Sequence, residues 1–165
     1  MMMRRNPSFS RDSSGAAAVE MALMLPLLLV LMFGTFEGGH YLWSEHKVVK
    51  GVRDGARYAA RTSFSNFNCG ANTVNAAVET NVKELTRTGQ LTGGTAKVRG
   101  WTNADVVVTL ACAASTGGLY TTNVGNDPIV TVTATVTYPS LFEMFGIGTN
   151  SVTLYSRASS AVMGL

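Results

Sequence analysis

Charged side chains are scarce in this sequence. They make up 14% of its 165 residues, whereas a typical soluble domain has about 25%. The formal net charge is only +3 at pH 7. The first twelve residues supply +2 of it, because they contain three arginines (Arg4, Arg5 and Arg11) and one aspartate (Asp12). Proteins that bind nucleic acid carry a larger basic excess, so nucleic acid is not an expected partner.

Motifs for catalysis and phosphate binding are also missing. The sequence has no Gly-x-x-x-x-Gly-Lys, no Gly-x-Ser-x-Gly and no His-Glu-x-x-His. Glu37 and His40 could share one helix face, but a di-iron site needs a second such pair from another helix, and the sequence offers none. We therefore expect a protein that is not an enzyme and that has no cofactor, no metal and no small-molecule substrate.

Cysteine is rare as well. Cys69 and Cys112 are the only two, and no Cys-x-x-Cys or nearby histidine pair accompanies them, which excludes the usual zinc patterns. In an exported domain they could form a disulfide that stabilises the fold by about 3–4 kcal/mol. The alternative is two buried free thiols, since cysteine packs as a small hydrophobic residue.

One long hydrophobic run is present. Residues 16–36 contain a single charge, on Glu20, and a helix of this length spans the roughly 30 Å of a bilayer core. A cleaved secretory signal would have a shorter apolar run, about 7–15 residues, with a small-residue cleavage site after it. The arginines that precede the run place the N-terminus in the cytoplasm and the C-terminal part outside.

Glu20 needs an explanation, because a carboxylate at the bilayer centre costs roughly 2.5–3.5 kcal/mol. It could lie at the interface, near the positive end of the helix dipole. Alternatively, cleavage after Gly15 would give Ala16 a free α-amino group. Because residues four apart share a helix face, that amine could pair with Glu20 of the same chain or of a neighbour. Pairing between chains would set the axial offset of packed helices.

These residues resemble a known family. The basic leader ending in Gly15, followed by AAAVEMALMLP, resembles type IV pilin-like prepilins. The longer GAAAVEMALMLPLLLVLMFGTFE, with VRDGARYAAR at 52–61, is similar to TadE-type pseudopilins of the Tad (tight-adherence) pilus apparatus. The resemblance implies a single-pass protein of the bacterial inner membrane with a periplasmic C-terminal domain. It also implies cleavage after Gly15 by a prepilin peptidase.

The implied partners are other pilin-like subunits and the inner-membrane Tad machinery, and the implied role is in pilus biogenesis, adhesion or secretion. Pro26 lies inside the hydrophobic run, where it is expected to kink the helix. It either takes part in packing between helices or is simply tolerated in a lipid anchor. An alternative from another functional class remains open: an uncleaved, singly anchored binding module or adhesin.

The helix is expected to continue to about residue 61 with two distinct faces. One face is basic and the adjoining one is small and apolar, and the latter should dock on the exported domain. The basic face is either solvated or contacts an acidic partner subunit or anionic phospholipid head groups. Its members recur at helical spacing: Lys47, Lys50, Arg53, Arg57 and Arg61.

The remaining sequence predicts an α+β domain with one further helix and an antiparallel sheet. The second helix should begin after a cap at Asn72 or Thr73 and end at Gly89. Strands are expected in 96–101, 104–113, 128–139 and 151–162, and the apolar stretch 140–148 is expected to be buried rather than to form a subunit contact. The expected division is a leader (1–15), the membrane helix with its extension (16–62) and the exported domain (63–165).

Overall fold

The computed structural model describes residues 13–115, 126–146 and 152–164. The chain divides into two compact units, Met1–Gly39 and His40–Leu165. The predicted fold class is confirmed: a long N-terminal apolar helix is followed by one further α-helix and antiparallel sheets.

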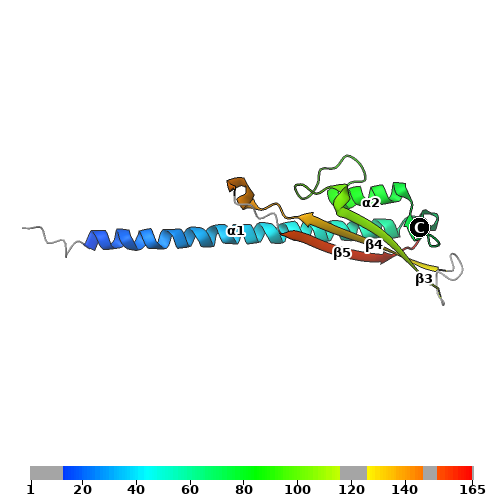
Figure 1. Cartoon of the computed structure of the whole chain (residues 1–165), viewed down its shortest axis with the longest axis horizontal. Helices are drawn as coiled ribbons and strands as arrows, with labels where there is room; N and C mark the ends of the chain where they lie inside the picture. Colours follow the sequence, from blue (N-terminus) through cyan, green and yellow to red (C-terminus); the bar gives the residue numbers. More distant parts are fainter. Residues whose placement is uncertain (1–12, 116–125, 147–151, 165) are drawn as a thin grey trace, which may run out of the picture. The chain divides into compact units, whose positions relative to one another are not determined.

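The first unit consists, where it is described, of the beginning of helix α1. This helix runs from Ser13 to Ala60, over 48 residues. Its most apolar window has a mean hydropathy of 2.3 and no buried residue, so the helix is long and apolar enough to cross a membrane. The helix continues through Pro26, and Figure 1 shows no sharp bend in this part of α1, in contrast to the expected kink.

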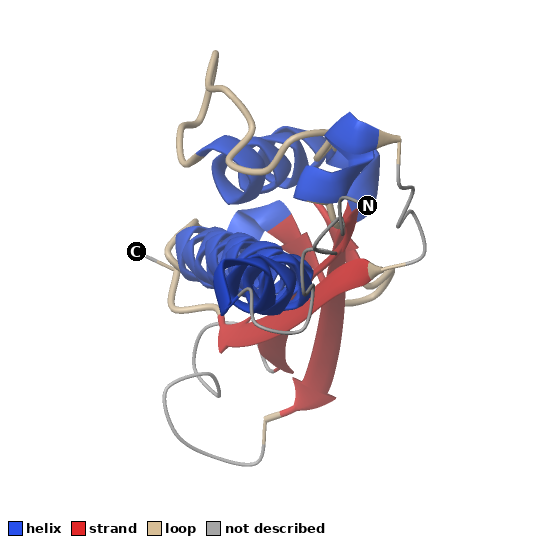
Figure 2. Ribbon diagram, turned by 90° about the vertical axis from the view of Figure 1, so that its left-hand side faces the viewer, coloured by secondary structure: helices blue, strands red, loops and turns tan. Residues whose placement is uncertain are grey.

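The second unit contains the rest of α1, helix α2 (Ala76–Thr88) and a three-stranded antiparallel sheet. The strands are β3 (Val106–Ala114), β4 (Asn126–Thr137) and β5 (Thr153–Ala161), in the order β3-β4-β5. Figure 2 shows both helices on the same side of this sheet. The other side of the sheet has no helix from the described part of the chain.

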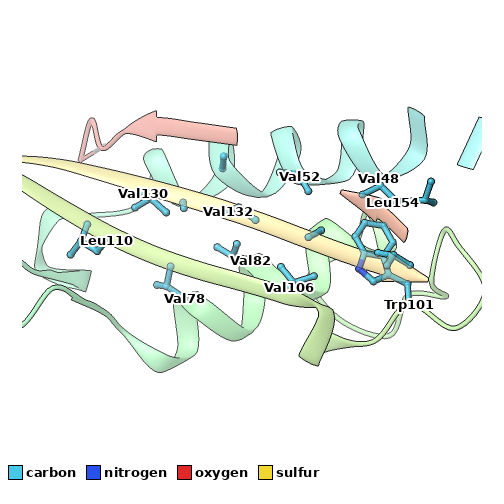
Figure 3. Close-up of a cluster of buried hydrophobic side chains, with 14 of the residues drawn as sticks. Val48, Val52, Val78, Val82, Trp101, Val106, Leu110, Val130, Val132 and Leu154 are labelled. Atoms are coloured by element: carbon cyan, nitrogen blue, oxygen red, sulfur yellow. The ribbon is translucent and has the colours of Figure 1, made fainter. Parts of the chain in front are cut away.

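Buried and exposed side chains alternate along β4, and this alternation decides which face of the strand meets the helices. Its valines and Ala134 are almost completely buried, whereas Thr135 and Thr137 are exposed. The buried side chains meet the apolar face of α1, as predicted, and that of α2 (Figure 3). The α1 face consists of Val48, Val52, Ala56, Ala59 and Ala60.

Two glycines allow α1 and α2 to touch. Gly51 and Gly55 stand one helical turn apart, and both face Thr86 of α2. A Cβ atom at Gly51 would overlap the Thr86 carbonyl oxygen, and one at Gly55 would overlap the Thr86 hydroxyl. Small residues four apart permit this close approach, so the backbone of α1 itself forms part of the helix interface.

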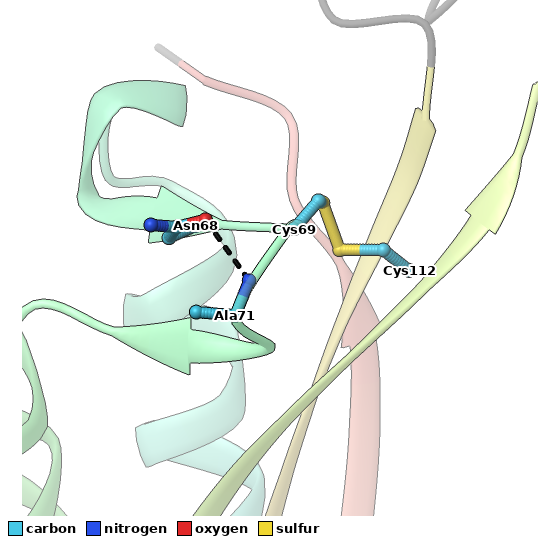
Figure 4. The surroundings of a disulfide bond; sticks show 4 residues. All are labelled: Asn68, Cys69, Ala71 and Cys112. Carbon is cyan, nitrogen blue, oxygen red and sulfur yellow. Dashed lines mark hydrogen bonds between the residues drawn. A yellow bond between two sulfur atoms is a disulfide. The ribbon is translucent and has the colours of Figure 1, made fainter.

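A small hairpin connects α1 to α2. Its strands β1 (Phe67–Asn68) and β2 (Thr73–Val74) pair antiparallel after the short 3-10 helix η2 (Phe64–Asn66). A disulfide between Cys69 in the hairpin and Cys112 in β3 joins the two sheets, with the Cα atoms 5.6 Å apart (Figure 4). Asn68 accepts a hydrogen bond from the Ala71 amide across the turn.

Three local predictions were wrong. The cap of α2 is Asn75, whose side chain accepts from the Ala77 amide, because the residues before it pair as a strand. No helix or strand was predicted in residues 62–72, and they include η2 and β1. Residues 96–101 form no strand, because Gly100 adopts a positive φ of 80° and the chain turns there to bury Trp101. The 3-10 helices η3 (Asn103–Asp105) and η4 (Leu141–Phe145) complete the described elements.

Substitution Gly55→Ala should destabilise the second unit. The added methyl overlaps Thr86, and overpacking of this kind costs roughly 1–3 kcal/mol, more than the helix propensity of about 1 kcal/mol that alanine adds. Thermal unfolding followed by circular dichroism measures the effect. Gly39→Ala is the matched control on the same helix, since nothing lies within 4 Å of its added Cβ. Equal melting temperatures for both variants would contradict the close helix contact.

Replacing both disulfide cysteines, Cys69→Ser with Cys112→Ser, should lower the free energy of unfolding by roughly 3–4 kcal/mol, because the bond closes a loop across 43 positions. Denaturant unfolding of the detergent-solubilised chain measures this loss. Alkylation of the unfolded wild-type chain without reductant should detect no free thiol. An unchanged unfolding midpoint in the double variant would show that the bond does not stabilise the fold.

Candidate functional site

The proposed processing residues lie in the first turns of α1. Gly15 is already helical, and Ala16 and Glu20 stand four residues apart on one face. Gly15, Ala16, Glu20 and Pro26 are all exposed. The apolar part of α1 therefore offers its whole circumference, including the Glu20 carboxylate, to lipid or to neighbouring helices.

Lys50, Arg53 and Arg57 are exposed on α1, and Arg61, also exposed, directly follows its last residue, Ala60. These four of the five predicted basic residues are called the basic face below. The ion pairs found among the described residues are Lys83 with Glu79, Arg87 with Glu84 and Arg99 with Glu143. The basic face belongs to none of these pairs, so its charges remain available to a partner.

The fifth residue, Lys47, is held differently. Its ammonium donates to the Lys97 carbonyl oxygen at 2.9 Å and lies 3.1 Å from the centre of the Trp43 ring. Desolvation by burial lowers the pKa of Lys47. The Lys47 ammonium group therefore already has two partners within its own chain, the Lys97 carbonyl oxygen and the Trp43 ring. The helical spacing of the basic residues could not show that Lys47 differs from the other four, because its partner Lys97 is 50 residues away in the sequence.

An aromatic cluster lies at the start of the second unit. His40 Nδ1 lies 3.0 Å from the hydroxyl of Tyr138, and the Tyr41 ring meets the Tyr138 ring edge-on at 5.2 Å. These contacts tie α1 to the segment that follows β4. They also occupy His40, and no group of three metal-ligating side chains occurs among the residues that the structure describes.

Apolar side chains near this cluster reach the surface. Leu42 and Trp43 on α1 are 56% and 57% exposed, and Leu141 of η4 is 43% exposed. The expectation that 140–148 would be buried is therefore wrong at Leu141. Residues 147–148 lie outside the described residues. Trp101, in contrast, is a core residue with 2% exposure, so the sequence could not assign its tryptophans to interface or core.

The apolar helix, the second unit and a family comparison together indicate what class of protein this is. One apolar N-terminal helix suggests a membrane anchor, and the α+β unit that follows it holds a disulfide. Residues 15–57 match the TadE-like protein family, which is consistent with a TadE-like protein and confirms the resemblance seen in the sequence. The family suggests a pilin-like protein associated with a Tad pilus, in a structural rather than a catalytic role.

The family match begins at Gly15 and lies entirely within α1. It therefore includes the apolar run, Glu20, Lys47 and most of the basic face, but none of the sheet. No curated protein matches the chain, and no solved structure matches it.

Substitution Tyr138→Phe should lower the free energy of unfolding of the second unit by about 1 kcal/mol, because it leaves the half-buried His40 nitrogen without its hydroxyl partner. Thermal unfolding measures the loss. Tyr155→Phe on β5 is the matched control, since its side chain is 61% exposed and should tolerate the same change. Equal losses in the two variants would rule out a stabilising His40–Tyr138 contact.

Proposed function

We propose that this protein is a minor pilin-like subunit, a pseudopilin, of a Tad-type pilus assembly. It is anchored in the bacterial inner membrane by residues 16–36 and presents its second unit to the periplasm. A prepilin peptidase removes the leader after Gly15. The protein then acts in pilus biogenesis, adhesion or secretion by packing its N-terminal helix with other pilin-like subunits. The match of residues 15–57 to the TadE-like family carries this proposal.

Two further observations support the proposed topology. Arg4, Arg5 and Arg11 precede the apolar run, and positive residues beside a span favour the cytoplasmic side. The disulfide between Cys69 and Cys112 is a bond that oxidising compartments such as the periplasm maintain.

Assembly would depend on a pair of charges in an apolar environment. Cleavage between Gly15 and Ala16 creates an ammonium group four residues before Glu20, about 6 Å along the helix axis. Each charge alone is expensive in lipid, whereas an ion pair lowers the cost for both. Since Glu20 is exposed on α1, its carboxylate is accessible to the amine of a neighbouring subunit. Such a pair sets the axial offset between the two helices.

Pro26 would contribute a second contact in the apolar run. It has no N–H to give to the carbonyl group of Ala22, one turn earlier, although α1 continues through this position. In a bilayer a free carbonyl group needs another donor. A polar side chain on a packed neighbouring helix would supply it, which makes the face around Pro26 a favourable place for subunit contact.

The basic face would bind an acidic surface of another subunit rather than lipid. Lys50 and Arg57 lie about 16 Å and about 27 Å along α1 from Gly39, whereas the head-group layer is only about 5–8 Å thick. Phospholipid head groups could therefore reach at most its first member. The alternative function, an uncleaved and singly anchored binding module or adhesin, would use the same fold with the leader still attached.

Mass spectrometry of the purified protein distinguishes the two functions. A chain that begins at Ala16 is expected for the pseudopilin, and a chain that begins at Met1 would refute it. Substitution Gly15→Val should block processing. Glu20→Ala should leave processing intact but reduce pilus assembly. Glu45→Ala is the control, because Glu45 is also on α1 but outside the apolar run. Normal assembly of Glu20→Ala would exclude the proposed charge pair.

A further inference from the structure

We propose that the second unit has its own lipid contact, formed by Trp43 and Leu141. This surface, called the apolar edge below, would enter the head-group layer on the outer side of the membrane. The inference rests on the membrane anchoring in the proposed function and adds a second attachment point to it. The contact would restrict how the second unit can tilt and rotate about its anchor.

The apolar edge is built from two elements that meet in space. Trp43 comes from α1, and Leu141 begins η4, almost a hundred residues later. Figure 1 shows η4, in orange, beyond the end of β4. Trp43 and Leu141 line one open groove of about 300 Å³ together with His40, Ser44 and Ser140. Trp43 is 57% exposed and Leu141 is 43% exposed.

Local contacts hold this edge in place. The Ser140 side chain caps η4 by accepting a hydrogen bond from the Phe142 amide, and Gly146 ends η4 in a left-handed conformation with φ of 75°. Next to Ser140, the His40–Tyr138 contact ties the same segment to α1. The exposed leucine is therefore part of an ordered turn rather than of an open loop.

The position of the edge along the chain favours lipid as its occupant. Trp43 comes seven residues after Phe36, the last residue of the apolar run, which is about 10 Å along a helix. The head-group layer is about 5–8 Å thick, and long helical side chains point back toward the N-terminus. The Trp43 ring can therefore reach the interface while its backbone stays just outside.

The chemistry of the edge also fits a bilayer surface. Tryptophan is enriched at membrane interfaces, where its ring lies at the level of the head groups. Lys47 places its ammonium over the Trp43 ring, and a lysine can cover apolar surface while its charge stays in water or meets a phosphate. Met163, another exposed apolar side chain of the second unit, lies near Ala60, far along α1 from the anchor.

Tryptophan quenching by brominated lipid tests the contact, because the chain has two tryptophans and only Trp43 is exposed. The full chain is reconstituted in phosphatidylcholine vesicles with or without bromine on the acyl chains just below the head groups. We expect the wild type to lose a clear part of its emission in the brominated vesicles, because an interfacial Trp43 ring lies close to the bromine atoms. Trp43→Phe, which retains only the buried Trp101, should lose almost none.

Two added tryptophans extend the test to the whole edge. In the Trp43→Phe background, Leu141→Trp should restore quenching. Met163→Trp is the matched control, because its side chain is 67% exposed and its amide bonds the Ala60 carbonyl oxygen, about 30 Å along α1 from His40. This variant should not be quenched.

Equal quenching of the wild type and Trp43→Phe would overturn the proposal and would leave a protein partner as the occupant of the edge. That failure is distinct from failure of the proposed function. A chain that begins at Ala16 and floats with the vesicles, but shows no Trp43 quenching, keeps the pseudopilin function and loses the lipid contact. A chain that does not float with the vesicles would refute both.

Discussion

Helix α1 has to fit two different surroundings, an exposed apolar stretch and the core of the second unit, and the rest of the molecule depends on how it does so. The first part of α1 is apolar around its whole circumference and has no buried residue in its most apolar window. The later part buries a narrow face of valine and alanine under the sheet and exposes the cations of the basic face. The change between the two patterns occurs near Gly39, where the second compact unit begins.

The small side chains of that second pattern determine how closely the elements can pack. Gly51 and Gly55 bring α2 against the backbone of α1, and this contact leaves room for the sheet to cover both helices (Figure 2). A protein interior has few voids, so the valines of β4 fill the space that the two helices leave. The helix whose apolar part suggests a membrane anchor is therefore also part of the hydrophobic core.

Strong periodic patterns made much of this fold predictable. The apolar run predicted the long helix, and the valine–threonine alternation in 130–138 predicted β4. The family resemblance was visible from residues 15–37 together with 52–61, and the family match covers most of these residues. These signals are local, so one sequence is sufficient to detect them.

Features that depend on residues far apart in the chain could not be predicted in the same way. Lys47 looked like part of the basic face until the Lys97 carbonyl oxygen and the Trp43 ring were found beside it. Leu141 looked like a core residue, because hydrophobic character does not show what covers a side chain. The Gly51–Gly55 spacing was in the sequence, but its meaning depended on where Thr86 lies.

In the proposed topology, the bond between Cys69 and Cys112 forms only after the second unit has left the cytoplasm. A newly made chain in the reducing cytoplasm would hold both thiols free, so the hairpin before α2 would be fastened to β3 only after translocation. Because the anchor precedes both cysteines in the sequence, the chain could be tethered before it is oxidised. In the proposed topology, oxidation outside the cytoplasm would then fasten the hairpin of a chain that is already tethered.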